Sequence, residues 1–366
     1  MASMGASRDR RWDVAIAGAG PAGLALAIEL ARTTPLRVAV VDAVTRHRMR
    51  LGETLSPEAR PLLAHLGVDA AFASGEHARC QGTIAAWGSD TAHYTDFLFH
   101  PSGHGWRVDR ERLEAALAAE AHRHGVERID GHVGALTRDG DEWKLHGDAP
   151  LRARMLVDAT GRQATVARRL GTQRLGADAL VGIAGVFEGI PRGPTEATWA
   201  VIESRHDGWG YSAVMPDGRV AVVAMTDSDL AHAAHLHDTA TWRAWIDELP
   251  RTARRIAGAT LAERPGVASA ASHRLDSPGG DGWLAIGDAA SSFDPLSSQG
   301  ITRALRSGIR AAAVIRDSLA GEPRAIAAYG EELAREYTAY LAARAAYYAM
   351  EQRWTASPFW QRRVAG

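Results

Sequence analysis

The sequence predicts an α/β protein in which a parallel sheet flanked by helices is joined to a second, mainly antiparallel sheet. Near the N-terminus, apolar runs at 12–17 and 36–41 enclose a helical stretch at 24–33, the order of a parallel β–α–β unit. Between residues 176 and 275, apolar, β-branched runs are separated by short turns, which predicts antiparallel strands. From Pro323 onward the chain is rich in alanine, glutamate and aromatic residues, which predicts a helical C-terminal segment.

A glycine-rich turn joins the first predicted strand to the first predicted helix. Residues 18–23 read GAGPAG, and the second strand ends in Asp42. Glycines at this spacing permit a tight turn, close approach of a pyrophosphate to the helix N-terminus, and close helix–strand packing. An acid after the next strand can accept hydrogen bonds from ribose hydroxyls. The pattern predicts a dinucleotide site and does not distinguish NAD from FAD.

A second stretch, residues 282–301, reads GWLAIGDAASSFDPLSSQGI. The apolar run 283–286 predicts a buried strand that ends in Gly287 and Asp288, and Asp294-Pro295 predicts a turn. Residues 297–300 then begin a helix, whose free N–H groups and positive dipole end suit a ring that becomes anionic when reduced. A capped helix after a strand in any α/β protein is the alternative interpretation of this stretch alone.

A third strand end repeats the combination of an acid and a glycine. The run 151–157 is followed by Asp158-Ala159-Thr160-Gly161, which suggests that one sheet edge contacts the same ligand twice. A helix beginning at Arg110 and strands at 126–133 and 142–146 are predicted upstream. The basic residues between 46 and 50, Arg50 included, form either a loop over the ligand or a solvated loop.

Composition limits the class of protein. The 366 residues are enough for one large or two moderate domains, and 46% hydrophobic residues is ordinary for a globular chain. A formal net charge of −1 predicts neither a nucleic-acid nor an anionic-membrane partner. The single cysteine, Cys80, excludes an internal disulfide and a cysteine metal cage, and no metal site is predicted. With no apolar run of membrane-spanning length and no secretory signal, we expect a cytoplasmic enzyme.

The three glycine-containing segments, GAGPAG, DATG and GDAASSFDPLSSQG, together resemble the FAD-dependent monooxygenase superfamily, the p-hydroxybenzoate-hydroxylase-like flavoproteins. The resemblance covers nearly the whole chain. It implies a Rossmann-like FAD-binding domain of the glutathione-reductase type, with an inserted, mainly antiparallel substrate domain. The expected boundaries are 10–70, 105–175 and 277–322 for the FAD-binding domain, 71–104 and 176–276 for the substrate domain, and 323–366 for the helical C-terminal segment.

The resemblance also implies roles for individual residues. Asp288 is expected to bind the ribityl chain, Arg110 to contact the ribityl or pyrophosphate region, and residues 297–301 to face the pyrimidine edge of the flavin. The motifs and the resemblance together predict these cofactor-binding residues: Gly18, Gly20, Ala22, Gly23, Asp42, Arg50, Arg110, Val133, Asp158, Gly161, Gly287, Asp288, Pro295, Ser298, Gln299, Gly300 and Ile301.

Within the superfamily, Gly52-Glu53, residues 208–212 with Met215-Pro216, and the Ser-Pro-Phe-Trp tail look like the tryptophan-halogenase group. Within that group, the phrases GWGYSAVMPDGR, AMTD and DPLSSQGI look most like the LodB-like flavoproteins. Those proteins modify a tryptophan of a partner protein during cysteine tryptophylquinone biosynthesis. Flavin-dependent halogenases need an active-site lysine. Lys144, in a predicted hairpin, is the only lysine among the 42 basic residues. The usual Trp-x-Trp-x-Ile-Pro motif is altered at 209–216, and Ser297 stands where tryptophan halogenases carry a glutamate.

The resemblance therefore implies hydroxylation of an electron-rich aromatic ring, with an indole as the expected ring, either free or in a protein or peptide. FAD would act through a C4a-hydroperoxide, and the reductant would be NAD(P)H, directly or through a separate flavin reductase. Halogenation is the main alternative, followed by an oxidase or a geranylgeranyl-reductase-type alkene reductase, and then by a non-catalytic maturation factor. The catalytic acid–base candidates are Glu53, Asp294, Glu203, His206 and Tyr211.

Overall fold

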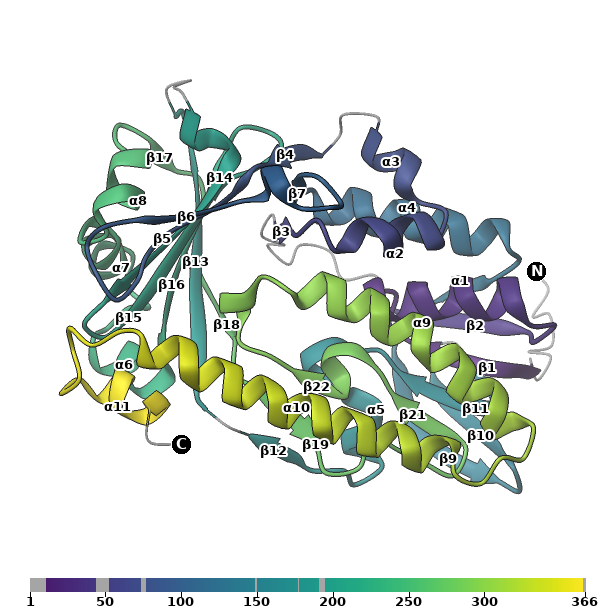
Figure 1. Ribbon diagram of the computed structural model, residues 1–366. Coiled ribbons are helices and arrows are strands. Elements are labelled where there is room, and N and C mark those ends of the chain that lie inside the picture. The colour runs from purple at the N-terminus through teal and green to yellow at the C-terminus, as the bar shows by residue number, and fades with distance from the viewer. Residues whose placement is uncertain are drawn as a thin grey trace, which may run out of the picture.

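Two large sheets lie side by side in the computed structural model, and long helices connect them (Figure 1). The structure describes residues 11–43, 53–73, 77–148, 150–176, 178–190 and 195–364. The predicted basic cluster at 46–50, including Arg50, lies outside these residues. In the described part of the chain, no helix is both long enough and apolar enough to cross a membrane.

The first sheet is parallel at its centre, in the order β21-β11-β1-β2-β8. These strands are β1 Arg11–Ala17, β2 Val38–Asp42, β8 Glu127–Asp130, β11 Leu151–Asp158 and β21 Trp283–Ala285. Three strands pair antiparallel at its margins: β9 Val133–Asp139, β10 Glu142–Gly147 and β20 Gly279–Gly280. The strand predicted at 126–133 is wrong as a single strand, because the chain turns at Gly131 (φ +156°), between β8 and β9.

Helices α1 (Pro21–Thr33), α4 (Arg110–Arg123) and α9 (Gly300–Leu319) contribute to one buried core of the first sheet. Helix α1 begins at Pro21, before the predicted Leu24, because proline is favoured in a first helical turn. Gly308 of α9 lies so close to α1 that a Cβ there would come within 2.3 Å of the Ala22 carbonyl oxygen. This close approach holds α9 against the glycine-rich turn.

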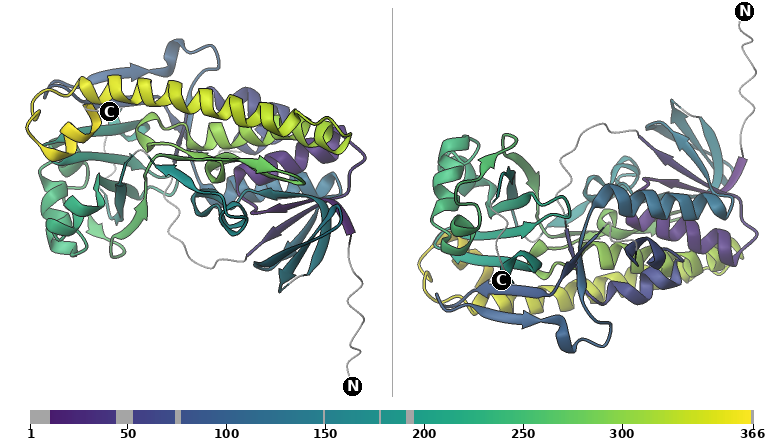
Figure 2. Two further views of the ribbon diagram at one scale, coloured as in Figure 1. Left: turned by 90° about the horizontal axis from the view of Figure 1, so that it is seen from below. Right: turned by 90° about the horizontal axis from the view of Figure 1, so that it is seen from above.

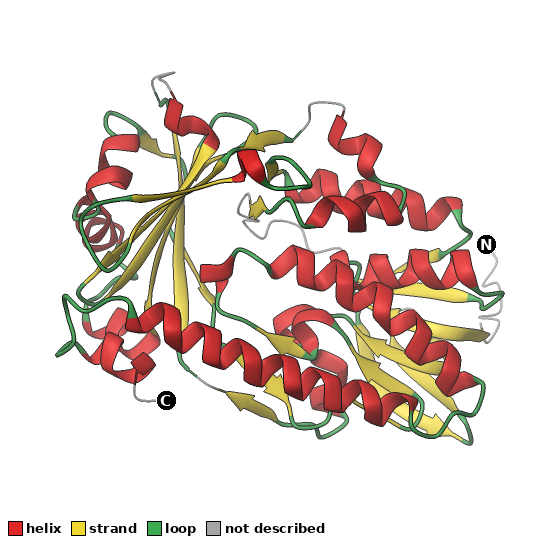
Figure 3. Ribbon diagram, in the orientation of Figure 1, coloured by secondary structure: helices red, strands yellow, loops and turns green. Residues whose placement is uncertain are grey.

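The second sheet has the order β17-β13-β16-β15-β14-β5-β6, with β18 also paired to β13. Its strands are β5 Gly82–Ala86, β6 His93–Asp96, β13 Leu180–Glu188, β14 Trp199–Arg205, β15 Gly208–Val214, β16 Val220–Asp227, β17 Thr260–Leu261 and β18 Gly266–Ser269. Figure 3 shows the long strands of this sheet and the helices beside them. Helix α7 (Thr239–Asp247) packs on one face, where Trp242 is fully buried. The opposite face carries a separate aromatic cluster, which includes Trp87, Trp209, Tyr348, Phe359 and Trp360.

The remaining elements connect the two halves. Two three-stranded sheets are formed by β3 Glu53–Leu55, β7 Gly105–Val108 and β4 Ala78–Cys80, and by β12 Arg174–Gly176, β19 His273–Leu275 and β22 Ser291–Ser292. The other helices are α2 Ala59–His65, α3 Asp69–Ala73, α5 Thr165–Arg169, α6 Ser228–Ala233, α8 Pro250–Arg255, α10 Ala325–Ala349 and α11 Pro358–Val364. Short 3-10 turns are η1 Phe97–Phe99, η2 Gly161–Gln163, η3 Thr195–Thr198, η4 Gly287–Ala289 and η5 Pro295–Ser297.

Helix α10 runs along one side of the molecule from the first sheet to the second (Figure 2). Near its start, Tyr329 packs in the core of the first sheet, and near its end Tyr348 packs in the aromatic cluster of the second. Both side chains are at most 2% exposed. The C-terminal helices therefore fix the relative position of the two sheets, and with it the shape of the space between them.

Candidate active site

The glycine-rich turn leaves an open space in front of helix α1. A Cβ on Gly18 (φ +109°) would lie 2.4 Å from the Ala159 carbonyl oxygen, and one on Gly23 would lie 2.1 Å from the Gly18 carbonyl oxygen. Both positions therefore require glycine for packing. Among the residues that the structure describes, a Cβ on Gly20 would meet nothing within 4 Å, and no side chain caps the N-terminus of α1. The free N–H groups there face a space that suits an anion.

Asp158 ends β11 and Asp42 ends β2, on either side of β1 at the same edge of the sheet, but their carboxylates have different partners. Asp42 accepts from the Ala19 N–H at 3.1 Å and keeps 30% of its side chain exposed. Asp158 is fully buried and accepts from the N–H and hydroxyl of Thr160 and from the Ala167 N–H. The Asp158 carboxylate thus faces the protein and not the predicted ligand. It holds the turn at Gly161 (φ +65°), where a Cβ would meet open space.

Asp288 lies in turn η4 and is held by an arginine that the sequence interpretation missed. Arg162 directs its Nε toward the Asp288 carboxylate at 3.5 Å and donates to the Phe293 carbonyl oxygen at 2.7 Å. Burial raises the pKa of Asp288, and the nearby Arg162, Arg110 and Arg303 oppose this shift. Arg162 directly follows the DATG segment, so its position next to a ligand-binding turn was the available clue.

The N-terminus of α9 presents backbone N–H donors close to Asp288. Ser298 adopts a left-handed conformation (φ +50°), and no side chain in the described part of the chain caps the helix. The first helical hydrogen bond runs from the Arg303 N–H to the Gln299 carbonyl, so the N–H groups of residues 300–302 have no intrahelical acceptor. A Cβ on Gly300 would meet open space, whereas Ile301 packs into the core at 3% exposure. The helix end is therefore open to a ligand.

A cavity of about 300 Å³ connects this helix end to the second sheet. Its sheet wall combines small and aromatic side chains, including Gly182, Ala184, Trp209, Tyr211 and Met225. The opposite wall of the cavity lies on the side of the first sheet. It is formed by Thr54, Arg162, Asp288, Phe293, Asp294, Pro295, Ser297, Ser298, Gly300 and Arg303. A flat, partly polar ligand held at Asp288 and α9 would thus share one space with a second, apolar molecule.

The family model described as "FAD binding domain" matches residues 11–342. The chain belongs to this family. It is a flavoprotein oxidoreductase, and its fold is the FAD-binding fold that the three segments predict.

Similar proteins include an FAD-dependent oxidoreductase, a tryptophan dihydroxylase and halogenases. The chain is 29% identical to LodB of Marinomonas mediterranea, which is named as an FAD-dependent oxidoreductase, over 97% of each chain. The structure of CndH, a myxobacterial chondrochloren halogenase, has a TM-score of 0.87 and 25% identity, covering 97% of this chain and 86% of the other. QhpG, named as a peptidyl tryptophan dihydroxylase essential for tryptophylquinone cofactor biogenesis, has a TM-score of 0.78 and 25% identity, with 96% and 78% covered.

The donor groups at the site fit FAD. The open space at Gly20 and the uncapped start of α1 suit the pyrophosphate, and Asp42 lies where a ribose hydroxyl can donate to it. Asp288 would accept from the ribityl hydroxyls, and the start of α9 would face the flavin ring. Arg110 pairs with Glu114 at 2.8 Å and lies near enough to lower the pKa of Asp288. Val133 begins β9, where its carbonyl oxygen accepts from Arg169.

The structure separates the catalytic candidates. The Tyr211 hydroxyl hydrogen-bonds the Thr54 hydroxyl at 2.8 Å, and both residues line the cavity. Glu203 accepts at 2.8 Å from the N–H groups of Arg251 and Thr252, at the start of α8, and does not line the cavity. The His206 side chain is 56% exposed in the β14–β15 turn and is likewise outside the cavity lining.

The two remaining acid–base candidates are Glu53 and Asp294. The backbone of Glu53 lies in β3, but its side chain is outside the described part of the structure. Asp294 lines the cavity with both carboxylate oxygens already engaged, by the Leu296 N–H at 2.9 Å and by the Tyr348 hydroxyl at 2.7 Å. Tyr348 in turn accepts from the Trp209 indole at 3.0 Å. Asp294 therefore ties the cavity wall to helix α10.

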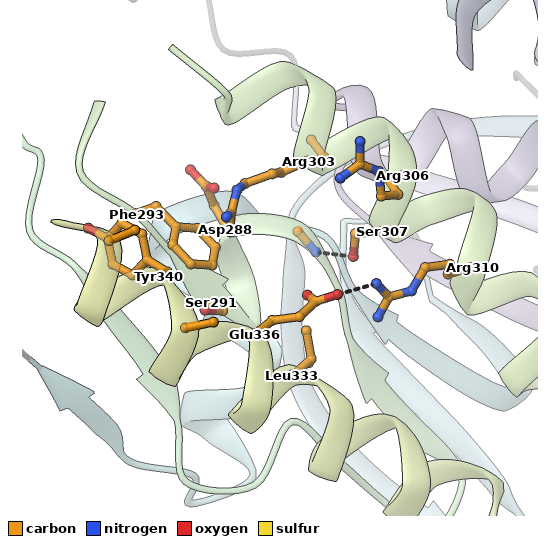
Figure 4. Close-up of a pocket in the computed structure, with 14 residues that line it drawn as sticks. Asp288, Ser291, Phe293, Arg303, Arg306, Ser307, Arg310, Leu333, Glu336 and Tyr340 are labelled. Carbon is orange, nitrogen blue, oxygen red and sulfur yellow. Dashed lines mark hydrogen bonds and ion pairs between the residues drawn. The ribbon is translucent and has the colours of Figure 1, made fainter. Parts of the chain in front are cut away.

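A second hollow, of about 380 Å³, lies between α9 and α10 behind Asp288 (Figure 4). The Arg303 guanidinium stacks over the Phe293 ring at 3.7 Å and forms part of both hollows. It makes no hydrogen bond or ion pair with any other residue that the structure describes. Across the hollow, Arg310 pairs with Glu336 at 2.5 Å (Figure 4). Arg303 thus places a positive charge, with Asp288 and Glu336 nearby but in no direct ion pair with them, next to the start of α9.

The free energy of unfolding should depend on pH through His273, a buried histidine near Arg162. Its Nδ1 lies 2.8 Å from the Ser292 hydroxyl, and burial, with Arg174 and Arg162 nearby, lowers the pKa of His273 to about 4. Between the ordinary histidine pKa of about 6.5 and this value, the unfolded chain binds a proton that the folded chain does not. The free energy of unfolding should therefore fall as the pH decreases through this range. When the free energy of unfolding is measured with urea at several pH values in this range, it should fall less steeply with decreasing pH for His273→Asn than for the unaltered chain. An unchanged pH dependence in His273→Asn would refute this role of His273.

Proposed function

We propose that this chain is an FAD-dependent monooxygenase that hydroxylates the indole ring of a tryptophan residue in a peptide or protein. The observation that carries the proposal is the cavity shared by Asp288, the start of α9 and the apolar wall of the second sheet. When bound, FAD supplies two-electron reduction and reaction with dioxygen. An aromatic ring against the buried side chains of Trp209 and Met225 would lie next to the flavin and would displace water from this part of the cavity.

The residues around the cavity support specific roles. The N–H groups at the start of α9, with Arg303 beside them, favour negative charge on the pyrimidine edge of the flavin. Among the acid–base candidates, Tyr211 carries a hydroxyl and lines the cavity. Its hydrogen bond to the Thr54 hydroxyl gives it a partner for proton transfer. Asp294 positions Tyr348 and turn η5 through its two carboxylate oxygens.

The position of Lys144 weighs against halogenation. Lys144 lies in β10 of the first sheet and pairs with Asp139 at 2.5 Å, outside the cavity lining. Halogenase-like attack requires a lysine that holds the halogenating species between flavin and substrate, and the chain has no second lysine. The name of QhpG supports the oxygenase interpretation and tryptophan in a peptide as the substrate class, and the name of LodB supports an FAD-dependent oxidoreductase.

Product analysis tests this function. FAD-loaded protein is supplied with NAD(P)H, with and without a flavin reductase, and offered either a tryptophan-containing peptide or free tryptophan, with and without bromide. We expect peptide heavier by one or more oxygen atoms, in equal yield with and without bromide, and catalase should not reduce the yield. Brominated product would support the halogenase alternative, and an unoxygenated product with an altered double bond would support the reductase or oxidase alternative.

A further inference from the structure

Strand β18 forms a free edge of the second sheet beside the cavity. It pairs with β13 on one side, where Ala268 lies opposite Gly182 and Gly266 lies opposite Ala184. All four residues of β18 are exposed, and Val267 is 59% exposed. Figure 1 shows β18 next to β13, on the side of the sheet that faces the other half of the molecule. The edge is therefore open in the part of the chain that the structure describes.

The backbone groups of this edge point outward at two residues. In an antiparallel pair, alternate residues exchange hydrogen bonds with the partner strand. The Ala270 N–H donates to the Leu180 carbonyl at 2.9 Å, so Ala268 and Gly266 are the residues of β18 that bond to β13. The N–H and C=O groups of Val267 and Ser269 face away from β13. Among the residues that the structure describes, none hydrogen-bonds to these four groups.

The same strand leads into the cavity. Ala268, Ser269 and Ala270 line it, next to Gly182 and Ala184 of β13. Because side chains alternate between the faces of a sheet, a strand added beside β18 would direct every second side chain toward the cavity face. On the cavity face, β18 contributes Ala268 and β13 contributes Gly182 and Ala184, and the flexible Met225 side chain packs over Gly182. A ring from the added strand would contact this wall of small side chains and Met225.

We propose that the free edge of β18 binds the substrate peptide as an additional strand, with its tryptophan side chain inserted into the cavity. The inference rests on the proposed function, because it states how the same site would hold a peptide-bound ring. Outward N–H and C=O groups at Val267 and Ser269 match the spacing of another extended backbone. Backbone hydrogen bonds would supply affinity that does not depend on the peptide's sequence, and the cavity would select the aromatic side chain.

The variant Val267→Pro tests the edge directly. Proline removes the outward N–H and leaves the hydrogen bonds between β18 and β13 intact, and prolines are tolerated on such edges. The control Val267→Ala also loses the valine side chain but keeps the N–H. The probe is a short, fluorescently labelled peptide with one tryptophan among threonines and valines, and binding to FAD-loaded protein is measured by fluorescence anisotropy. We expect Val267→Pro to weaken binding about tenfold and Val267→Ala to change it less than about threefold.

A second measurement does not depend on the variants. Methylating single backbone nitrogens of the peptide should weaken its binding to the unaltered protein at alternate positions along the peptide and not at the others, because alternate residues face β18. Equal binding by Val267→Pro and Val267→Ala, with equal thermal midpoints, would overturn the proposal, as would uniform effects of methylation. Peptide that binds in a Val267→Pro-sensitive manner without being oxygenated would support the docking edge and refute the proposed function.

Discussion

Replacing Gly20 with valine should abolish FAD binding without unfolding the protein. A Cβ at this position meets no other atom within 4 Å, and its backbone conformation (φ −77°, ψ 178°) is one that valine adopts readily. The valine side chain would instead occupy the space in front of α1 that we assign to the pyrophosphate. We expect FAD affinity to fall by at least about 100-fold, or about 2.7 kcal/mol, when measured by flavin fluorescence titration.

A matched control separates this effect from a general effect of valine. Gly176 in β12 also has open space around its Cβ position and lies outside both hollows. Gly176→Val should bind FAD as the unaltered chain does. Unaltered FAD affinity in Gly20→Val would show that the pyrophosphate does not lie at the glycine-rich turn, whatever the thermal midpoints of the two variants.

Replacing Asp227 with alanine should lower the free energy of unfolding by about 3–5 kcal/mol, because it leaves a buried arginine without its counter-charge. Arg363 of helix α11 donates to Asp227 at 2.6 Å, and the two side chains are 1% and 2% exposed. Helix α11 also carries Trp360, which donates to the Arg205 carbonyl oxygen at 2.9 Å and packs against Trp87. Urea unfolding should show this lower free energy of unfolding. The aromatic cluster behind the cavity should lose its packing against α11.

The neighbouring acid provides the control. Asp229 pairs with Arg362 at 2.7 Å, but these side chains are 58% and 45% exposed. Exposed pairs of this kind contribute at most about 1 kcal/mol, so Asp229→Ala should change the free energy of unfolding little. If the two variants were equally stable, the pair between Arg363 and Asp227 would not be what anchors helix α11.

Elements with strong local patterns could be predicted from the sequence. The run before GAGPAG forms β1, and the runs at 151–157 and 283–286 form β11 and β21, which pair in parallel so that their carboxyl ends meet. The antiparallel strands of the second sheet were also anticipated, because their alternation and turns are local features. The break at Gly131 was missed although Asp130-Gly131 is a typical turn dipeptide, because the apolar residues on both sides of it suggested one strand.

Individual site residues were harder to predict, because a motif gives a position and not the direction of a side chain. Asp158 and Asp288 both follow strands, yet one carboxylate is consumed by its own turn and the other remains partly exposed. Glu203 has the chemistry of a general base, but two backbone N–H groups of α8 use it. Arg162 contacts Phe293, which is 131 positions away, so its place directly after DATG was the available clue to its role. No local pattern shows that the Arg303 side chain stacks on Phe293.

The origin of the added oxygen tests the central claim most directly. The FAD-loaded protein would be reduced and exposed to isotopically labelled dioxygen in ordinary water, with the tryptophan peptide present, and the product would be analysed by mass spectrometry. The account predicts that the label appears on the indole ring of the peptide. A modified peptide whose oxygen comes from water, or a peptide left unmodified while the flavin is reoxidised, would contradict it.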